Sequence, residues 1–140
     1  MKKNRFKNSM FKAAKSLVNT LPIIFGTILL FSLIITIIPK SFYLSIFKNS
    51  IFDPILGSLV GSISAGNPIT SYILGGEFLE QGVGLMAVTA FLVAWVSVGV
   101  IQLPAESMIL GKKFAVLRNL SSFIFAIIVA ILTVIILGVF

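Results

Sequence analysis

Residues 61–76 read "GSISAGNPITSYILGG", an uncharged segment with five polar side chains and the helix-breaking sequence Gly66-Asn67-Pro68. Asparagine is a strong helix N-cap and proline is favoured at the first helical position, so the pair predicts that a helix begins here. The surrounding chain is strongly apolar, with a mean hydropathy of +1.13. In water the segment would be a loop. In lipid its freed backbone groups must be buried by protein or line a polar cavity.

The composition of the chain indicates that the solvent is lipid. Of 140 residues, 58% are hydrophobic and 11% are charged, whereas about a quarter of the residues in a soluble domain are charged. Four runs are free of charge, at residues 16–39, 54–76, 81–105 and 119–140, and each has the roughly 20 residues that a membrane-spanning helix needs. We therefore predict an all-α polytopic membrane protein of the cell (plasma) membrane, in contact with the lipid bilayer.

The basic residues indicate the orientation of the chain. Six of the eleven lie ahead of the first apolar run, where the positive-inside rule places them on the cytoplasmic side. This placement accounts for the net charge of +7 without a nucleic-acid partner. We predict a basic N-terminal segment over residues 1–17, with a short interfacial helix at 5–16, and a single transmembrane domain over 18–140. The six basic residues are Lys2, Lys3, Arg5, Lys7, Lys12 and Lys15.

The residues that the chain lacks exclude several kinds of chemistry. There is no cysteine and no histidine, and the only acids are Asp53, Glu77, Glu80 and Glu106. Disulfides, thiolate or imidazole metal ligands and the usual general base are therefore missing. We predict that the protein is not an enzyme and that it has no catalytic, cofactor-binding or metal-binding residues.

The rest of the chain predicts three full spans around the broken segment. The first covers residues 18–38 and ends at Pro39, the second is uninterrupted over 82–103, and the third covers 121–139. Residues 40–53 are too short to cross and suit an interfacial helix. Pro104 predicts a new helix that begins beside Glu106.

Small residues predict where helices approach closely. "GSLVG" at residues 57–61 has glycines four residues apart, and a stripe of small residues recurs along the second span. Trp95 lies near the middle of that span and is predicted to face protein, and the pair Gly75-Gly76 predicts the end of the helix that follows the break. The stripe consists of Ala87, Ala90, Ala94 and Ser97.

Residues 54–76 can cross the membrane as one interrupted helix, giving four spans, or enter and leave it on one side as a re-entrant hairpin. The hairpin places nine basic residues inside and two outside, and the spanning alternative places six inside and five outside. The positive-inside rule therefore favours the hairpin. In both arrangements a half-helix begins at Asn67 near the middle of the membrane.

A half-helix whose N-terminus faces a cavity is how secondary transporters bind an anionic group. The alternative is a structural kink whose backbone is satisfied by a serine. Glu106 can bind a proton or a cationic group, or can serve as the cap of its helix. The default for Glu77 and Glu80 is a solvated loop. The candidate translocation residues are Ser62, Ser64, Gly66, Asn67, Pro68, Thr70, Gln102 and Glu106.

Three blocks carry a resemblance to a known family. "GSISAGNPITSYILGG", "AVTAFLVAWVSVGVIQLPAE" and "LGKKFAVLRN" resemble the predicted-permease family that includes the organoarsenical efflux permeases, over about residues 15–138. The resemblance implies that the break is the translocation element. Members linked to arsenicals carry cysteines at the break, where this chain has Ser64-Ala65-Gly66, so thiolate capture of arsenic is not expected. Larger members are roughly twice as long and contain two related halves, and this chain resembles one half.

The sequence thus predicts a small permease or permease half for a small solute that can be anionic. Three or four spans cannot enclose a pathway alone, so a homodimer or a pairing with a related half is expected. The alternative is a non-transporting membrane scaffold or assembly subunit that packs through its Gly, Ala and Ser faces.

Overall fold

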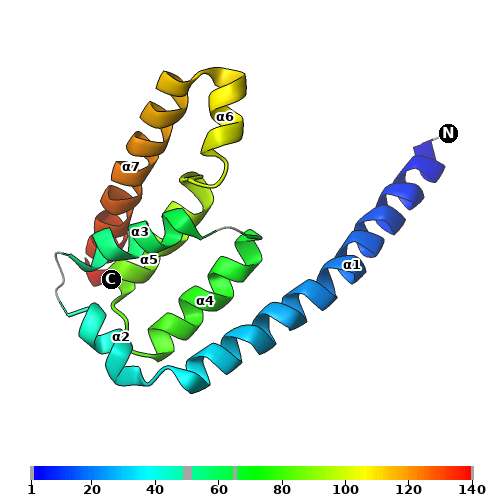
Figure 1. Ribbon diagram of the computed structural model, residues 1–140. Helices are drawn as coiled ribbons and strands as arrows, with labels where there is room; N and C mark the ends of the chain where they lie inside the picture. The colour runs from blue at the N-terminus through cyan, green and yellow to red at the C-terminus, as the bar shows by residue number, and fades with distance from the viewer. Residues whose placement is uncertain (1, 49–51, 65, 140) are drawn as a thin grey trace. The chain divides into compact units, whose positions relative to one another are not determined.

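The computed structural model describes residues 2–48, 52–64 and 66–139, and within these ranges it contains seven α-helices and no strand (Figure 1). The chain divides into two compact units, Met1–Ile38 and Pro39–Phe140. The first unit holds a single helix. The second holds the other six helices and all of the candidate site residues.

The first unit is the helix α1, Lys2–Ile37. Its 36 residues correspond to a length of about 54 Å. The sequence predicted a separate interfacial helix at 5–16 and a first span that begins at residue 18, but α1 runs through both, past Pro22, without interruption, and this prediction is wrong. A proline removes only one backbone donor, and helices in apolar surroundings keep their remaining hydrogen bonds. The predicted stop before Pro39 is confirmed.

The second unit begins with α2, Lys40–Ile46, directly after Pro39. The helix is shorter than the predicted interfacial helix at 40–53, of which residues 49–51 lie outside the described chain. Tyr43 is its one buried residue, and its ring lies 6.0 Å from that of Phe78, centroid to centroid. The short helix therefore packs on protein through one face.

The predicted break separates α3, Asp53–Ile63, from α4, Pro68–Glu80. Asn67 caps α4 as predicted, because its side chain accepts a hydrogen bond of 3.0 Å from the N–H of Ile69. The predicted end of α4 at Gly75-Gly76 is wrong. Gly75 packs against α5 instead, and α4 continues to Glu80 before the chain turns at Gly82, which has a φ of +91°. Glu77 and Glu80 thus belong to the last turns of α4 rather than to a loop.

The chain reverses direction at this break. Phe78 near the end of α4 lies beside Tyr43 of α2, and α2 immediately precedes α3 in the sequence. Figure 1 shows α4 running back from the point where α3 ends. The two arms therefore form a hairpin whose tip is the Gly66-Asn67-Pro68 segment.

The predicted uninterrupted span at 82–103 is also broken. The helix α5, Leu85–Ser97, ends before Gly99, and α6, Leu103–Leu110, begins with Pro104 in its first turn. The N–H of Gly99 donates to Asn119 Oδ1 at 2.8 Å instead of to a helical carbonyl. A turn at Gly111, with a φ of +89°, leads into α7, Lys112–Val139. The last helix therefore begins nine residues before the predicted span at 121.

Close packing of small residues forms the core, as the sequence predicted. Gly57 faces Ala87 of α5, and Gly61 faces Phe91 and Ala94. Because residue numbers rise together along the two helices, α3 and α5 run parallel. Ala94 also packs with Ala126 of α7.

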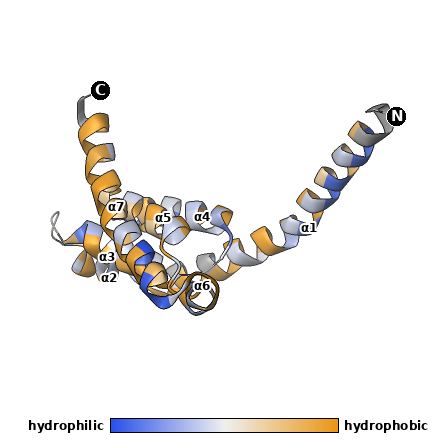
Figure 2. Ribbon diagram, turned by 90° about the horizontal axis from the view of Figure 1, so that it is seen from above, coloured by the Kyte–Doolittle hydropathy of each residue, from blue (hydrophilic) through white to orange (hydrophobic). Residues whose placement is uncertain are grey.

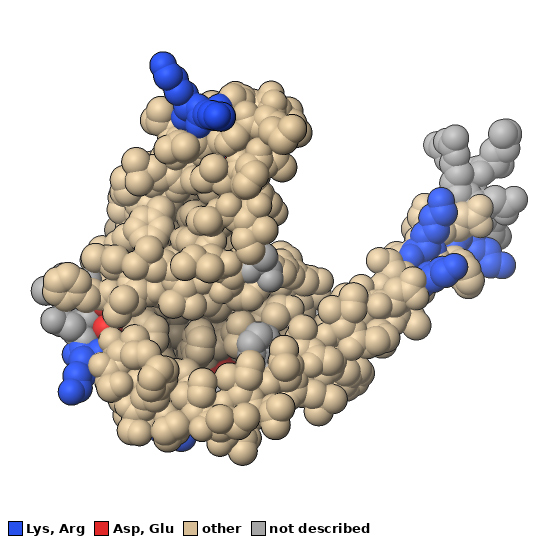
Figure 3. Space-filling view, viewed as in Figure 1, with Lys and Arg blue, Asp and Glu red and all other residues tan. Residues whose placement is uncertain are grey.

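The exterior of the second unit is largely apolar. In the described ranges two segments, Phe6–Ile34 of α1 and Lys112–Gly138 of α7, are long and apolar enough to cross a membrane. Figure 2 shows apolar residues along most of α7, where large side chains such as Phe125 and Ile136 are more than half exposed. The face seen in Figure 3 has few charged side chains. A soluble monomer rarely exposes so much contiguous apolar surface.

Candidate functional site

The two helix breaks of the second unit meet at one cavity. Its volume is about 70 Å³, and both the α3–α4 break and the α5–α6 break contribute to its wall. None of the lining side chains is charged. The cavity is lined by Ser64, Gly66, Trp95, Val96, Val98, Gly99, Val100, Ile101 and Gln102.

The structure brings together three of the predicted site residues, Ser64, Gly66 and Gln102. Gln102 folds back over the second break, so that a Cβ at Gly99 would lie 3.0 Å from its Oε1. Asn67 and Pro68 are exposed beside the cavity without lining it. The two breaks are far apart in the sequence, and the packing of α3 on α5 places them side by side.

The other predicted residues lie outside the cavity. Ser62 and Thr70 are buried, and the Ser62 hydroxyl donates to the carbonyl of Ser58 within its own helix. The Ser64 hydroxyl donates to the Val60 carbonyl at 2.7 Å. The structural-kink alternative predicted that a serine satisfies the backbone at the break. The Ser62 and Ser64 hydroxyls do bond to carbonyls in the last turns of α3.

Helix geometry gives the cavity a polar backbone. Because α3 and α5 run parallel, their C-terminal ends both reach it, and the last carbonyls of a helix lack intrahelical partners. The regular pattern of α5 stops at Val98, whose N–H donates to Ala94. Such ends carry partial negative charge, whereas α4 and α6 begin beyond the breaks with positive ends. The first N–H groups of α4 and α6 are satisfied locally, as in the bonds from Ile69 to Asn67 and from Leu103 to Val100, so the polar groups in the cavity wall are helix-end carbonyls and the side chains of Ser64 and Gln102.

Trp95 supplies a further donor. Its Nε1 atom is buried and makes no hydrogen bond to any described residue. The indole lies against the first break, since a Cβ at Gly66 would be 3.2 Å from Cζ2 of the ring. A buried polar group normally has a partner, so a polar molecule that enters the cavity can accept a hydrogen bond from this indole.

A polar network behind the cavity holds the second break in place. Asn119 is 6% exposed. Its Oδ1 accepts from the Gly99 N–H, and its Nδ2 donates to the Ala115 carbonyl at 3.0 Å and to Glu106 Oε2 at 3.4 Å. Glu106 Oε1 in turn forms a 2.6 Å ion pair with Arg118. Glu106 therefore acts as a link between α6 and α7 rather than as a lining residue.

Sequence reasoning missed Asn119 and the second break. The available signals were a glycine five residues before Pro104 and an amide at the start of the last charge-free run. Neither signal is specific, because the bond that ends α5 joins residues 20 positions apart.

The assignment of a family to this chain rests on the sequence resemblance alone. That resemblance stays a prediction. Comparison of the chain with protein-family models, with curated proteins and with solved structures found no match.

Proposed function

We propose that the chain is an integral-membrane permease, or one half of a permease, whose small solute passes the cavity between the two breaks. The observation that carries this proposal is that two separate breaks meet at one cavity with uncharged polar groups in its wall. Backbone groups freed from a helix are tolerated at membrane depth only where protein buries them or where they line a wet cavity. Discontinuous helices that meet near the midplane form the solute sites of many secondary transporters.

The proposed placement in the membrane follows the direction of the helices. With the N-terminus in the cytoplasm, α1 crosses once, α5 and α6 together form a discontinuous crossing, and α7 crosses back. The reversal between α3 and α4 supports a re-entrant hairpin over residues 54–76. In this multi-pass arrangement the turn that carries Lys112 and Lys113 lies on the cytoplasmic side, in agreement with the positive-inside rule.

A second copy or a related half would complete the pathway, because transporter sites form between repeats. The alternative role, a scaffold that assembles through small-residue faces, receives less support. Gly57, Gly61 and Ala94 are occupied by contacts within the chain, so these faces are not available to a partner.

Cysteine accessibility tests the proposal, because the natural sequence contains no cysteine. We expect Ser64→Cys and Gln102→Cys, each reconstituted in liposomes, to react with a small charged methanethiosulfonate added to the water. A wet pathway makes the thiolate available there, whereas hydrocarbon suppresses both ionisation and reagent entry. The measurement is the labelled fraction by mass spectrometry.

The matched controls are Ile131→Cys on the exposed face of α7 and Ala94→Cys in the core, which are 37% and 0% exposed in the native residues. Both should remain unlabelled while the folded protein inserts normally. Unreactive cysteines at both 64 and 102 would favour the dry interface of a scaffold and would overturn the proposed pathway.

A further inference from the structure

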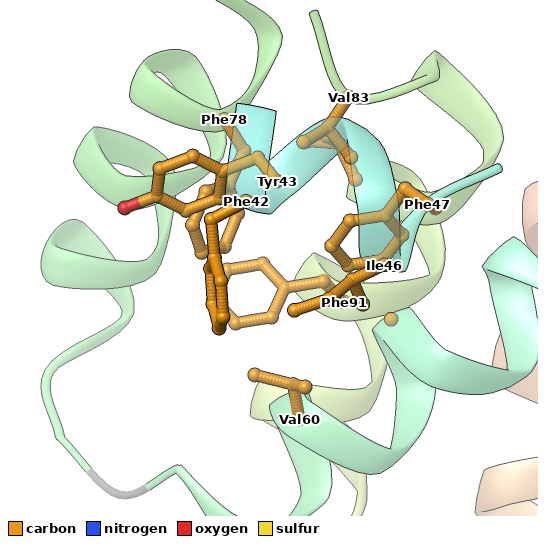
Figure 4. Close-up of a pocket in the computed structure, with 11 residues that line it drawn as sticks. Phe42, Tyr43, Ile46, Phe47, Val60, Phe78, Val83 and Phe91 are labelled. Atoms are coloured by element: carbon orange, nitrogen blue, oxygen red, sulfur yellow. The ribbon is translucent and has the colours of Figure 1, made fainter. Parts of the chain in front are cut away.

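A second cavity, separate from the breaks, lies beneath α2. Its volume is about 160 Å³, and Figure 4 shows the aromatic rings around it. Phe42 and Tyr43 of α2, together with Phe47 directly after the helix, form one side, and Phe78 and Phe91 form part of another. The hydroxyl of Tyr43 points away from the ring cluster in Figure 4. The cavity therefore presents hydrocarbon and aromatic surface to an occupant.

The size and lining of this cavity select its occupant. An apolar cavity of about 150 Å³ stays dry and binds molecules of the size of benzene. The volume is too small for the helix of a partner protein but suits a short segment of one hydrocarbon chain. In a bilayer, the abundant molecule with such a chain is a lipid, and each buried methylene contributes favourably to binding.

Positive charge flanks the same helix. Lys40 begins α2, and Lys48 directly follows the lining residue Phe47; both lysines are exposed. Lys40 and Tyr43 are three residues apart in α2, which places them on the same side of the helix. Residues 39–48 contain no acid. A negatively charged headgroup would thus find two cations at the rim of an apolar cavity.

We propose that this cavity binds the headgroup-proximal segment of an acyl chain of an anionic phospholipid, with the phosphate held by Lys40 and Lys48. The proposal does not depend on solute transport, because none of its residues lines the cavity between the breaks. It assigns α2 the role of a lid over a lipid chain, and it accounts for the aromatic residues and lysines that occur together at positions 40–48.

The test titrates the delipidated protein in detergent with phosphatidylglycerol and measures bound lipid by native mass spectrometry. Val60→Phe fills the cavity, and Leu59→Phe is the matched control, because both residues are 45% exposed on α3 and only Val60 lines the cavity. We expect one tightly bound lipid per wild-type chain, loss of that lipid in Val60→Phe, and its retention in Leu59→Phe.

The contribution of the headgroup is tested with the double variant Lys40→Gln/Lys48→Gln. The matched control is the double variant Lys112→Gln/Lys113→Gln, which removes two positive charges from α7 instead. The first pair should weaken phosphatidylglycerol binding about tenfold, since basic residues near anionic lipid each contribute on the order of 1 kcal/mol before screening. The second pair should leave binding unchanged. Equal binding of phosphatidylcholine with the same chains, or full retention of lipid in Val60→Phe, would overturn the proposal. A change of oligomeric state in Val60→Phe without lipid loss would identify a second copy as the occupant and would also overturn it.

Discussion

Gly61→Ala should lower the free energy of unfolding by about 1–3 kcal/mol, the usual effect of overpacking a core. A Cβ at this position would overlap the carbonyl oxygen of Phe91 and would lie 3.1 Å from the backbone nitrogen of Trp95. These are backbone atoms of α5 that cannot rotate away, so α3 and α5 must move apart. The measurement is an unfolding titration in mixed micelles, followed by the fluorescence of Trp95, the only tryptophan in the chain.

Gly76→Ala provides the matched control, because Gly76 also lies inside a helix and a Cβ there would meet no atom within 4 Å. This substitution should leave stability unchanged or raise it by up to about 1 kcal/mol through helix propensity. Equal losses for Gly61→Ala and Gly76→Ala would show that the contact between α3 and α5 is not as close as described.

The second large effect is expected for Asn119→Ala. Removal of this side chain leaves the partly buried Gly99 N–H without its acceptor and Glu106 Oε2 without a donor. An unsatisfied buried group destabilises by about 1–3 kcal/mol. The loss should appear in the same unfolding titration and should be accompanied by a change in the emission of Trp95, which lies near the second break.

Ser121→Ala controls for the removal of a polar side chain from α7, since the exposed Ser121 hydroxyl only donates to the carbonyl of Arg118. Its effect should stay within about 0.5 kcal/mol, as for most surface substitutions. If Asn119→Ala were as mild as Ser121→Ala and left the Trp95 emission unchanged, the second break would be held by backbone preference alone.

Local chemistry was sufficient to predict the first break. Asn67 and Pro68 start α4 in the conformation that their types favour, and the stripe of small residues packs as its spacing indicates. Each of these features depends on residues within one or two turns. Predictions of this kind succeed because the capping amide and the fixed φ of proline act on adjacent backbone.

The features that sequence reasoning missed are set by distant contacts. Gly75 was expected to end a helix, but Val88 and Leu92 of α5 pack against it and the helix continues. The second break depends on Asn119, whose amide competes for the N–H of Gly99. The residues around Gly99 do not indicate which side chain of α7 lies opposite its N–H group. The cavity itself could not be predicted, because it forms only when the packing of α3 on α5 brings the two breaks side by side.

The two breaks differ in what fixes them, and this difference sets where hydrogen exchange should be fast. The second break is tied to α7 through Asn119, whereas the hydrogen bond that caps α4 at the first break joins two neighbours, the Ile69 N–H and the Asn67 side chain. The N–H of Ile69 can therefore open without separating two helices. Protection at Gly99, by contrast, is lost only when α5 and α7 part. Deuterium uptake at these two amides would thus report separately on a local opening of the hairpin tip and on the integrity of the helix pair that supports it.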